Sequence, residues 1–130
     1  MAGKIDQMRE RYDRFGQGDI DGATDLWADD FVWQGSNSTE LPGGGEHSGR
    51  DTALQVLGQA VGTWDEFKLT PDEYFEDGDT VVVLGHTDVK KGDDTAQLQV
   101  VHIWRWDGDQ VKRLQILTDT HQAADLLGVS

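Results

Sequence analysis

Cysteine is absent from this chain of 130 residues, and proline occurs only twice. Without cysteine there are no disulfides, no thiol catalysis and no thiolate metal sites, so packing must provide the stability. Long apolar runs are also lacking, since no stretch approaches the roughly 20 residues that a membrane span needs. The N-terminus shows no apolar run of signal length, and we expect a cytoplasmic protein that has no membrane partner.

Basic residues are scarce: 11 Lys and Arg stand against 25 Asp and Glu, which gives a net charge of -14. A field of that sign repels phosphate backbones and anionic lipid surfaces, which argues against nucleic acid as a partner. The length suits one domain spanning 1–130, and the five Trp residues favour a packed interior.

The first part of the chain has helical periodicity. Ile5, Met8, Tyr12 and Phe15 follow each other at spacings of three and four, which predicts a helix over 5–15. Similar spacing predicts a short helix over 20–27 and a third helix over 50–64. A short strand is expected at 31–33. The glycine-rich segment 35–49 is too long for a plain connection and indicates a lid-like or functional loop.

The second part alternates with the period of strands. Four strands are predicted at 67–75, 80–89, 97–106 and 111–118, separated by turns that contain Asp-Gly or Lys-Gly. Short turns make neighbouring strands antiparallel, and a tail helix over 122–127 follows. Helices first and a meander of strands afterwards is the α+β pattern.

The strand at 97–106 carries apolar residues on both faces. His102 and Trp104 share one face, whereas Val101 and Ile103 share the other. Helices can cover only one of these faces. We therefore expect a homodimer in which a second copy covers the other face of the sheet.

Four stretches together resemble the SnoaL-like, ketosteroid isomerase-related group of bacterial proteins in the nuclear transport factor 2-like superfamily. They are Gly18-Asp19-Ile20-Asp21-Gly22-Ala23 with the following segment to Trp33, Pro42 to Asp51, and Glu76 to Gly85 with the closing Thr118-Asp119-Thr120. The resemblance covers nearly the whole chain in order. It implies a cone-shaped α+β barrel, in which three N-terminal helices pack on a strongly curved, mostly antiparallel sheet around one apolar pocket.

The steroid isomerases of this superfamily use an aspartate base and an oxyanion hole made of Tyr and a protonated Asp. By resemblance the base position falls on Gly35 and the second Asp position near Val101. The Tyr position falls on Arg11, with Tyr12 one residue out of step. The resemblance therefore does not extend to the steroid isomerase mechanism.

Asp119 matches the acid/base aspartate on the last strand of the polyketide cyclases in this superfamily. Asp is poorly suited to a strand, and a desolvated carboxylate would have a raised pKa suited to proton transfer. The alternative is structural, with Asp119 ending the strand and Thr120 capping the tail helix. His102 lies mid-strand and is a second catalytic candidate, although a lone strand histidine is commonly structural.

The remaining candidates are a metal site and the residues that would bind a substrate. His86, His102 and His121 with Asp119 contain no close-spaced ligand motif, so no metal and no cofactor are expected. Gly43 to Gly45 lack the Lys-Ser/Thr of a phosphate loop. We expect the substrate-binding residues to be Tyr12, Trp33, His47 and Trp104, although Trp104 also suits core packing.

Two functions follow from these observations. The first is a cofactor-independent acid/base enzyme of isomerase, cyclase, hydrolase or dehydratase type, acting on a small apolar or aromatic carbonyl compound through Asp119 and His102. The second is a non-catalytic module that binds a hydrophobic ligand or a protein. The superfamily resemblance is compatible with both, because one fold hosts many functions.

Overall fold

The computed structural model describes residues 3–129 and consists of one curved, six-stranded sheet with helices on one face. The helices are α1 (Lys4–Gly16), α2 (Ile20–Ala23), α3 (Arg50–Gly62) and α4 (Thr120–Leu127). The strands are β1 (Trp27–Gln34), β2 (Glu46–Ser48), β3 (Glu66–Asp77), β4 (Thr80–Lys91), β5 (Asp94–Asp107) and β6 (Gln110–Thr118). This arrangement confirms the α+β class and the curved, mostly antiparallel sheet.

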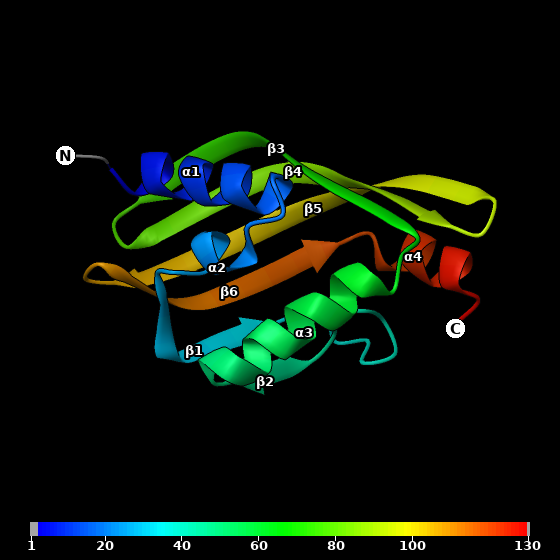
Figure 1. Cartoon of the computed structure of the whole chain (residues 1–130), viewed down its shortest axis with the longest axis horizontal. Helices are drawn as coiled ribbons and strands as arrows, with labels where there is room; N and C mark the ends of the chain where they lie inside the picture. Colours follow the sequence, from blue (N-terminus) through cyan, green and yellow to red (C-terminus); the bar gives the residue numbers. More distant parts are fainter. Residues whose placement is uncertain (1–2, 130) are drawn as a thin grey trace.

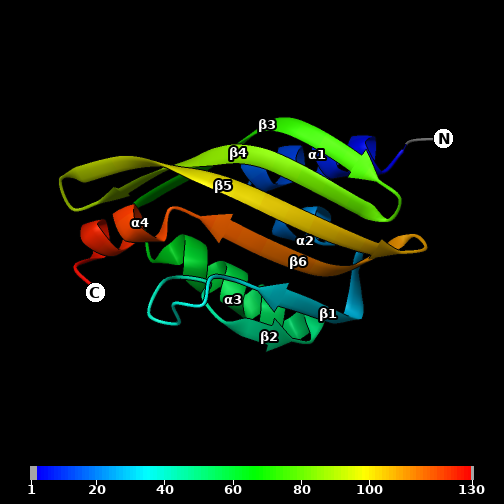
Figure 2. The same cartoon turned by 180° about the vertical axis from the view of Figure 1, so that it is seen from behind.

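The strands follow the order β2-β1-β6-β5-β4-β3, and among the described residues β1 and β6 are the only neighbours that run parallel. Three tight turns join β3 to β6 in a meander, as the Asp-Gly and Lys-Gly signals predict. In Figure 1 helices α1, α2 and α3 lie across one face of the sheet, and α4 sits beside the end of β6. Figure 2 shows the opposite face without helices. No helix among residues 3–129 is long and apolar enough to cross a membrane.

Helix α2 is shorter than predicted. It ends at Ala23, and Trp27 begins β1 instead of closing the helix. The reason is tertiary: Trp27 pairs with Val111 of β6, and the backbone N–H of Val111 donates to the carbonyl of Leu26 at 2.8 Å. The Trp27 ring then stacks on Phe31 at 4.1 Å between centroids, deep in the core. Pairing and burial outweigh the local helical spacing.

The segment predicted as an irregular loop contains a strand. Residues 46–48 form β2, which pairs antiparallel with the end of β1 and shortens the loop to 35–45. Within this loop Gly43 has a φ of +74°, and an added Cβ would lie 3.1 Å from the Trp33 ring. A glycine is therefore needed there. The Gly43 carbonyl accepts a hydrogen bond from the Trp33 indole at 2.8 Å, which ties the loop to β1.

The position of the helices shows which face of β5 points into the protein. Leu98, Val100, His102, Trp104 and Trp106 point inward and are all buried. The opposite residues of β5 lie on the face without helices, where neighbouring strands add further apolar side chains. We name this surface the outer patch; it comprises Phe75, Val82, Leu84, Val101, Ile103 and Leu117, which are linked across β3 to β6 by strand register.

Candidate active site

A cavity of about 170 Å³ lies between the helices and the concave face of the sheet. Its wall is mostly apolar and includes four of the five Trp side chains, at positions 27, 33, 64 and 104. For comparison, an engineered apolar cavity of about 150 Å³ holds a benzene molecule. The enclosed space therefore suits one aromatic ring with small substituents.

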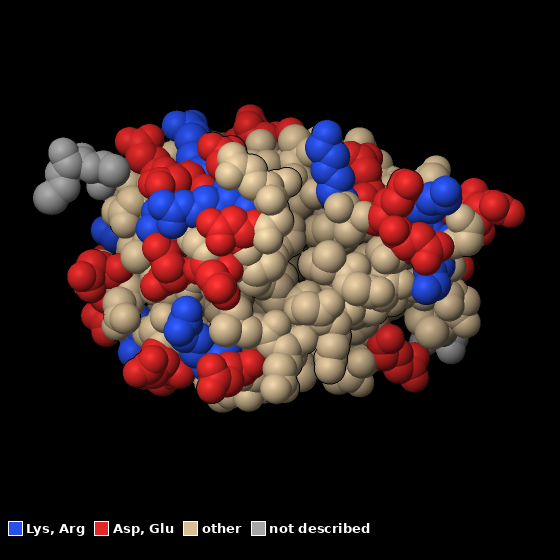
Figure 3. Space-filling view, in the orientation of Figure 1, with Lys and Arg blue, Asp and Glu red and all other residues tan. Residues whose placement is uncertain are grey.

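The cavity opens between the helices. Phe15 of α1, Leu57 and Val61 of α3 and Phe67 of β3 line this side, and Figure 3 shows the surface hollowed between these elements. The rings of Phe15 and Phe67 meet edge to face at 6.2 Å. Charged residues on this face gather away from the hollow (Figure 3), so a ligand entering the cavity first meets apolar side chains.

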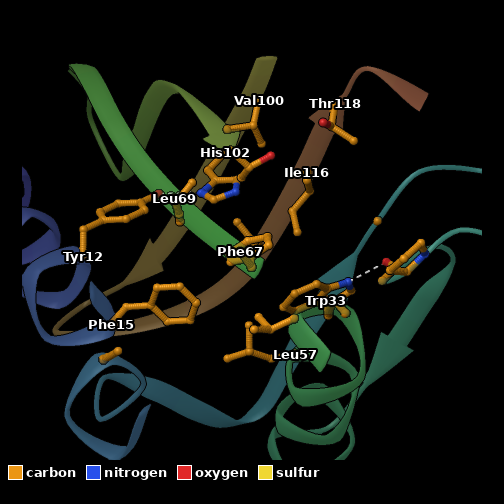
Figure 4. Close-up of a pocket in the computed structure, with 18 of the residues that line it drawn as sticks. Tyr12, Phe15, Trp33, Leu57, Phe67, Leu69, Val100, His102, Ile116 and Thr118 are labelled. Atoms are coloured by element: carbon orange, nitrogen blue, oxygen red, sulfur yellow. Dashed lines mark hydrogen bonds between the residues drawn. The ribbon is translucent and has the colours of Figure 1, made fainter. Parts of the chain in front are cut away.

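Three side chains in the inner wall are joined by hydrogen bonds. The Tyr12 hydroxyl lies 2.6 Å from Nδ1 of His102, and the indole N–H of Trp104 donates to the Tyr12 oxygen at 2.9 Å. Helical spacing places Tyr12 on the inward side of α1, while alternation places His102 and Trp104 on the inward side of β5. Figure 4 shows Tyr12 and His102 reaching toward each other from these two elements.

Burial decides the charge of this group. It lowers the pKa of His102 from 6.5 to about 4, because a charged imidazolium is poorly solvated in the apolar wall. Burial also raises the pKa of the Tyr12 hydroxyl far above its ordinary value, and the Trp104 hydrogen bond offsets only part of that rise. At neutral pH, Tyr12 and His102 are therefore both uncharged.

The second ring nitrogen of His102, Nε2, has no hydrogen-bond partner among the described residues. Two other side-chain nitrogens, Nε of Arg50 and Nε1 of Trp106, also have no partner there, but they are fully buried. Nε2 of His102 is not among these fully buried atoms. Of the other polar side chains in the cavity wall, Thr118 bonds to protein, because its hydroxyl donates to the Gln99 carbonyl at 2.9 Å. The imidazole thus has one nitrogen committed to Tyr12 and one available to a ligand.

Four of the six predicted site residues line the cavity, namely Tyr12, Trp33, His102 and Trp104. Trp33 is 3% exposed, so it forms part of the inner wall and not an open mouth. His47 does not reach the cavity, because its Nε2 bonds to the Gly44 carbonyl at 2.9 Å and holds the glycine loop.

Asp119 lies outside the cavity. Its side chain is exposed and accepts a hydrogen bond from the backbone N–H of Gln122 at 3.0 Å, which makes it the N-cap of α4. The expected cap, Thr120, is instead the first residue of that helix. Thr118 and Ala123, which lie close to Asp119 in the sequence, do line the cavity. A structural role for Asp119 is visible, and its catalytic role stays a prediction.

The three histidines considered for a metal site lie apart. His86 bonds through Nδ1 to Asp72 at 2.8 Å, and the His121 side chain is 92% exposed. His102 is buried with Tyr12 inside the cavity wall. Within residues 3–129 no group of three or more His, Cys, Asp or Glu is arranged to hold a metal ion.

Gly35 shows why the isomerase base is missing here. An added Cβ at this position would lie 1.8 Å from the carbonyl oxygen of Gly43, so the glycine loop occupies the space of any side chain. The departure at Gly35 thus has a structural cause. The sequence did not show whether Trp104 belongs to the core or to the site. Its spacing shows which face of the strand it occupies, but cannot show that its N–H donates to Tyr12.

The SnoaL-like domain model matches residues 8–114. An NTF2-like protein of unknown function from Burkholderia pseudomallei is 29% identical, with a TM-score of 0.87 over 98% of both chains. TerC, crystallised with polyporic acid, is 27% identical with a TM-score of 0.85 over 95% of this chain and 97% of that one. IdmH of Streptomyces antibioticus, a proposed polyketide cyclase, shares the fold at 18% identity, with a TM-score of 0.75 over 96% and 98%. No curated protein matches the sequence.

Proposed function

The chain belongs to the SnoaL-like domain family, and from this premise we propose that it is a cofactor-independent enzyme that promotes proton transfer on a small aromatic carbonyl compound. The observation that carries this proposal is the Tyr12–His102 pair, buried in a mostly apolar cavity wall with one ring nitrogen available. His102 can share a proton with a substrate oxygen through this nitrogen, while Tyr12 hydrogen-bonds its other ring nitrogen.

The chemistry follows from the environment of this pair. When a proton leaves the carbon beside a carbonyl, negative charge develops on the oxygen. A hydrogen-bonding group fixed in a low-dielectric cavity stabilises that charge far more than water does. A neutral imidazole serves this purpose in other enzymes, and the lowered pKa of His102, about 4, keeps this one neutral.

The substrate class follows from the wall. A cavity of about 170 Å³ that is lined by several indole rings favours a flat aromatic body over a flexible or charged one. TerC, which is 27% identical to this chain, was crystallised with polyporic acid.

Deuterium exchange tests the proposal. With acetophenone in D₂O, we expect the protein to accelerate exchange of the methyl protons, with water taking the proton and returning a deuteron. Tyr12→Phe and His102→Asn should each slow this exchange by about 10²-fold or more, the usual contribution of acid/base groups. No acceleration by the wild-type protein for any aromatic ketone that binds in the cavity would reject the enzymatic proposal.

A binding module is the second candidate. It is favoured by one specific observation, namely that no Asp or Glu is among the described residues that line the cavity. Without a carboxylate the cavity lacks an anionic base of its own. Saturable quenching of tryptophan fluorescence by acetophenone, combined with no exchange and no chemical change, would select this alternative.

We also propose that two copies associate through the outer patch. Phe75 is 53% exposed and Leu117 is 50% exposed, which is unusual for large apolar side chains. Register links them into one surface, because Phe75 pairs with Val82, Val82 with Ile103, and Val101 with Leu117. Contiguous apolar surface of this kind is typical of protein interfaces, and a second copy would bury it without blocking the cavity on the opposite face.

A further inference from the structure

We propose that Trp104 and Tyr12 are positioning residues that hold His102 with its proton on Nε2. The inner end of the cavity then presents an N–H donor and selects ligands that bring a carbonyl or quinone oxygen to it. The nature of the ligand rests on the proposed function. The position of the proton is a property of the ligand-free protein and can be measured without any ligand.

The donors and acceptors in these hydrogen bonds can be assigned starting from Trp104. An indole nitrogen is a donor only, so the 2.9 Å contact must be Trp104 N–H donating to the Tyr12 oxygen. The hydroxyl proton of Tyr12 cannot point toward Trp104, because two protons would then face each other. The remaining partner is Nδ1 of His102, at 2.6 Å.

The opposite arrangement leaves a donor unsatisfied. If Nδ1 of His102 carried the proton and donated to Tyr12, the Tyr12 hydroxyl proton would have no acceptor among the described residues, of which only Trp104 and His102 hydrogen-bond to it. Tyr12 is only 9% exposed. A buried donor without a partner is costly enough to bias two tautomers by roughly tenfold or more. The proton of His102 therefore belongs on Nε2, where the cavity can satisfy it.

This assignment has a consequence for recognition. A donor at Nε2 is satisfied by a ligand oxygen that accepts, as in a ketone, an aldehyde or a quinone. An apolar ligand of the same shape would fill the cavity but leave Nε2–H without a partner. The difference between the two ligands should be about three- to tenfold in affinity, which is the usual net effect of one neutral hydrogen bond.

Nitrogen NMR on ¹⁵N-histidine-labelled protein at pH 7 tests the tautomer. In the ligand-free wild type we expect one tautomer, with His102 Nε2 protonated and Nδ1 unprotonated. Trp104→Phe removes the indole donor and leaves room for a water that can accept from Tyr12, so both tautomers should appear. Tyr12→Phe should produce a mixture as well. A wild type protonated at Nδ1, or a Trp104→Phe protein identical to wild type, would overturn the assignment.

Trp106→Phe is the matched control for this measurement. Trp106 lies two residues further along β5 on the same inward face, is equally buried at 5% against 6%, and has an indole nitrogen without a partner. Its replacement loses the same atoms but no hydrogen bond to Tyr12 or His102, because the Trp106 indole nitrogen has no partner among the described residues. We expect the His102 tautomer to stay unchanged. A change as large as that of Trp104→Phe would make the effect one of general packing and refute positioning by Trp104.

A matched pair of probes tests the recognition. Acetophenone and α-methylstyrene have the same flat shape, but only the first carries an acceptor oxygen. Titration by tryptophan fluorescence gives the ratio of their dissociation constants. This ratio should shift by about three- to tenfold toward α-methylstyrene when His102→Asn removes Nε2. An equal ratio in both proteins would overturn the selection of acceptor oxygens.

The two proposals fail in different ways. A His102 protonated at Nδ1 in a protein that still accelerates acetophenone exchange would overturn the positioning role and leave the proposed function standing. Failure of both probes to bind would overturn the ligand class together with the proposed function. The tautomer in the ligand-free protein would still decide the role of Trp104.

Discussion

Acidification should destabilise this protein through His102. Burial lowers the pKa of this imidazole to about 4 in the folded chain, against 6.5 for the ordinary group that the unfolded chain resembles. Between these two values the unfolded chain binds one proton more than the folded chain does. Stability is therefore complete above the unfolded value and declines as the pH falls from 6.5 toward 4.

The size of the effect follows from the pKa difference. One pKa unit corresponds to about 1.4 kcal/mol, so a fall from 6.5 to about 4 amounts to roughly 3 kcal/mol of unfolding free energy over the whole interval. At pH 5 about 2 kcal/mol of this should already be lost. A domain of this size has only about 5–15 kcal/mol in total, so the change is easily measured.

Urea unfolding followed by tryptophan fluorescence at pH 7.5, 6.5, 5.5 and 5.0 measures this loss. His102→Asn provides the comparison, because it removes the titrating ring and leaves every other ionisable group in place. The wild type should lose about 2 kcal/mol more than His102→Asn over this range. Ring proton signals of His102 in NMR should stay constant over the same range.

Parallel loss of stability in the two proteins would refute the buried neutral imidazole. So would an NMR titration of His102 with a midpoint near 6.5, since a solvated ring has that ordinary pKa. Either result would also remove the reason for expecting a neutral hydrogen-bonding group in the cavity.

Three further pairs of substitutions test other parts of the structure. Gly35→Ala should lower the free energy of unfolding in urea by about 1–3 kcal/mol, because the added Cβ would meet the Gly43 carbonyl. The control Gly58→Ala on α3, where an added Cβ has nothing within 4 Å, should raise it by up to about 1 kcal/mol; equal effects would contradict the close contact. Asp119→Ala should cost about 1 kcal/mol through the lost cap of α4, and Asp119→Asn should retain it; loss of ketone exchange in a stable Asp119→Asn protein would show that Asp119 is catalytic. Leu117→Asp should convert the dimer to a monomer in light scattering. The control Ile20→Asp, at an exposed apolar residue on the helical side, should leave the dimer intact; a monomeric wild type at micromolar concentration would contradict the interface.

Local patterns were sufficient for the elements whose partners are close in sequence. Alternation and the three glycine turns predict the meander of β3 to β6, because each hairpin contains its own turn and both its strands. The spacing of Met8 and Tyr12 likewise predicts α1 and its inward side. These features depend on the helical and strand periods, which a sequence displays directly.

Elements with distant partners were predicted less well. β2 contains three residues, too few to show a period, and it forms because β1 lies beside it. β1 itself starts at Trp27 because β6, more than eighty positions later, pairs with it. Neither partner is visible in a short window of the chain.

The candidate site divides in the same way. The residue types were evident from the sequence: Tyr12 on a helical face, His102 and Trp104 on one face of a strand, and an aspartate after the last strand. Only the tertiary structure decided that the His102 face is the inward one, that Asp119 turns away to cap α4, and that Tyr12 lies 2.6 Å from a histidine ninety positions away. The physical reason is range, because periodicity records how a segment presents its own side chains. A hydrogen bond depends on a few tenths of an ångström between segments that only packing brings together.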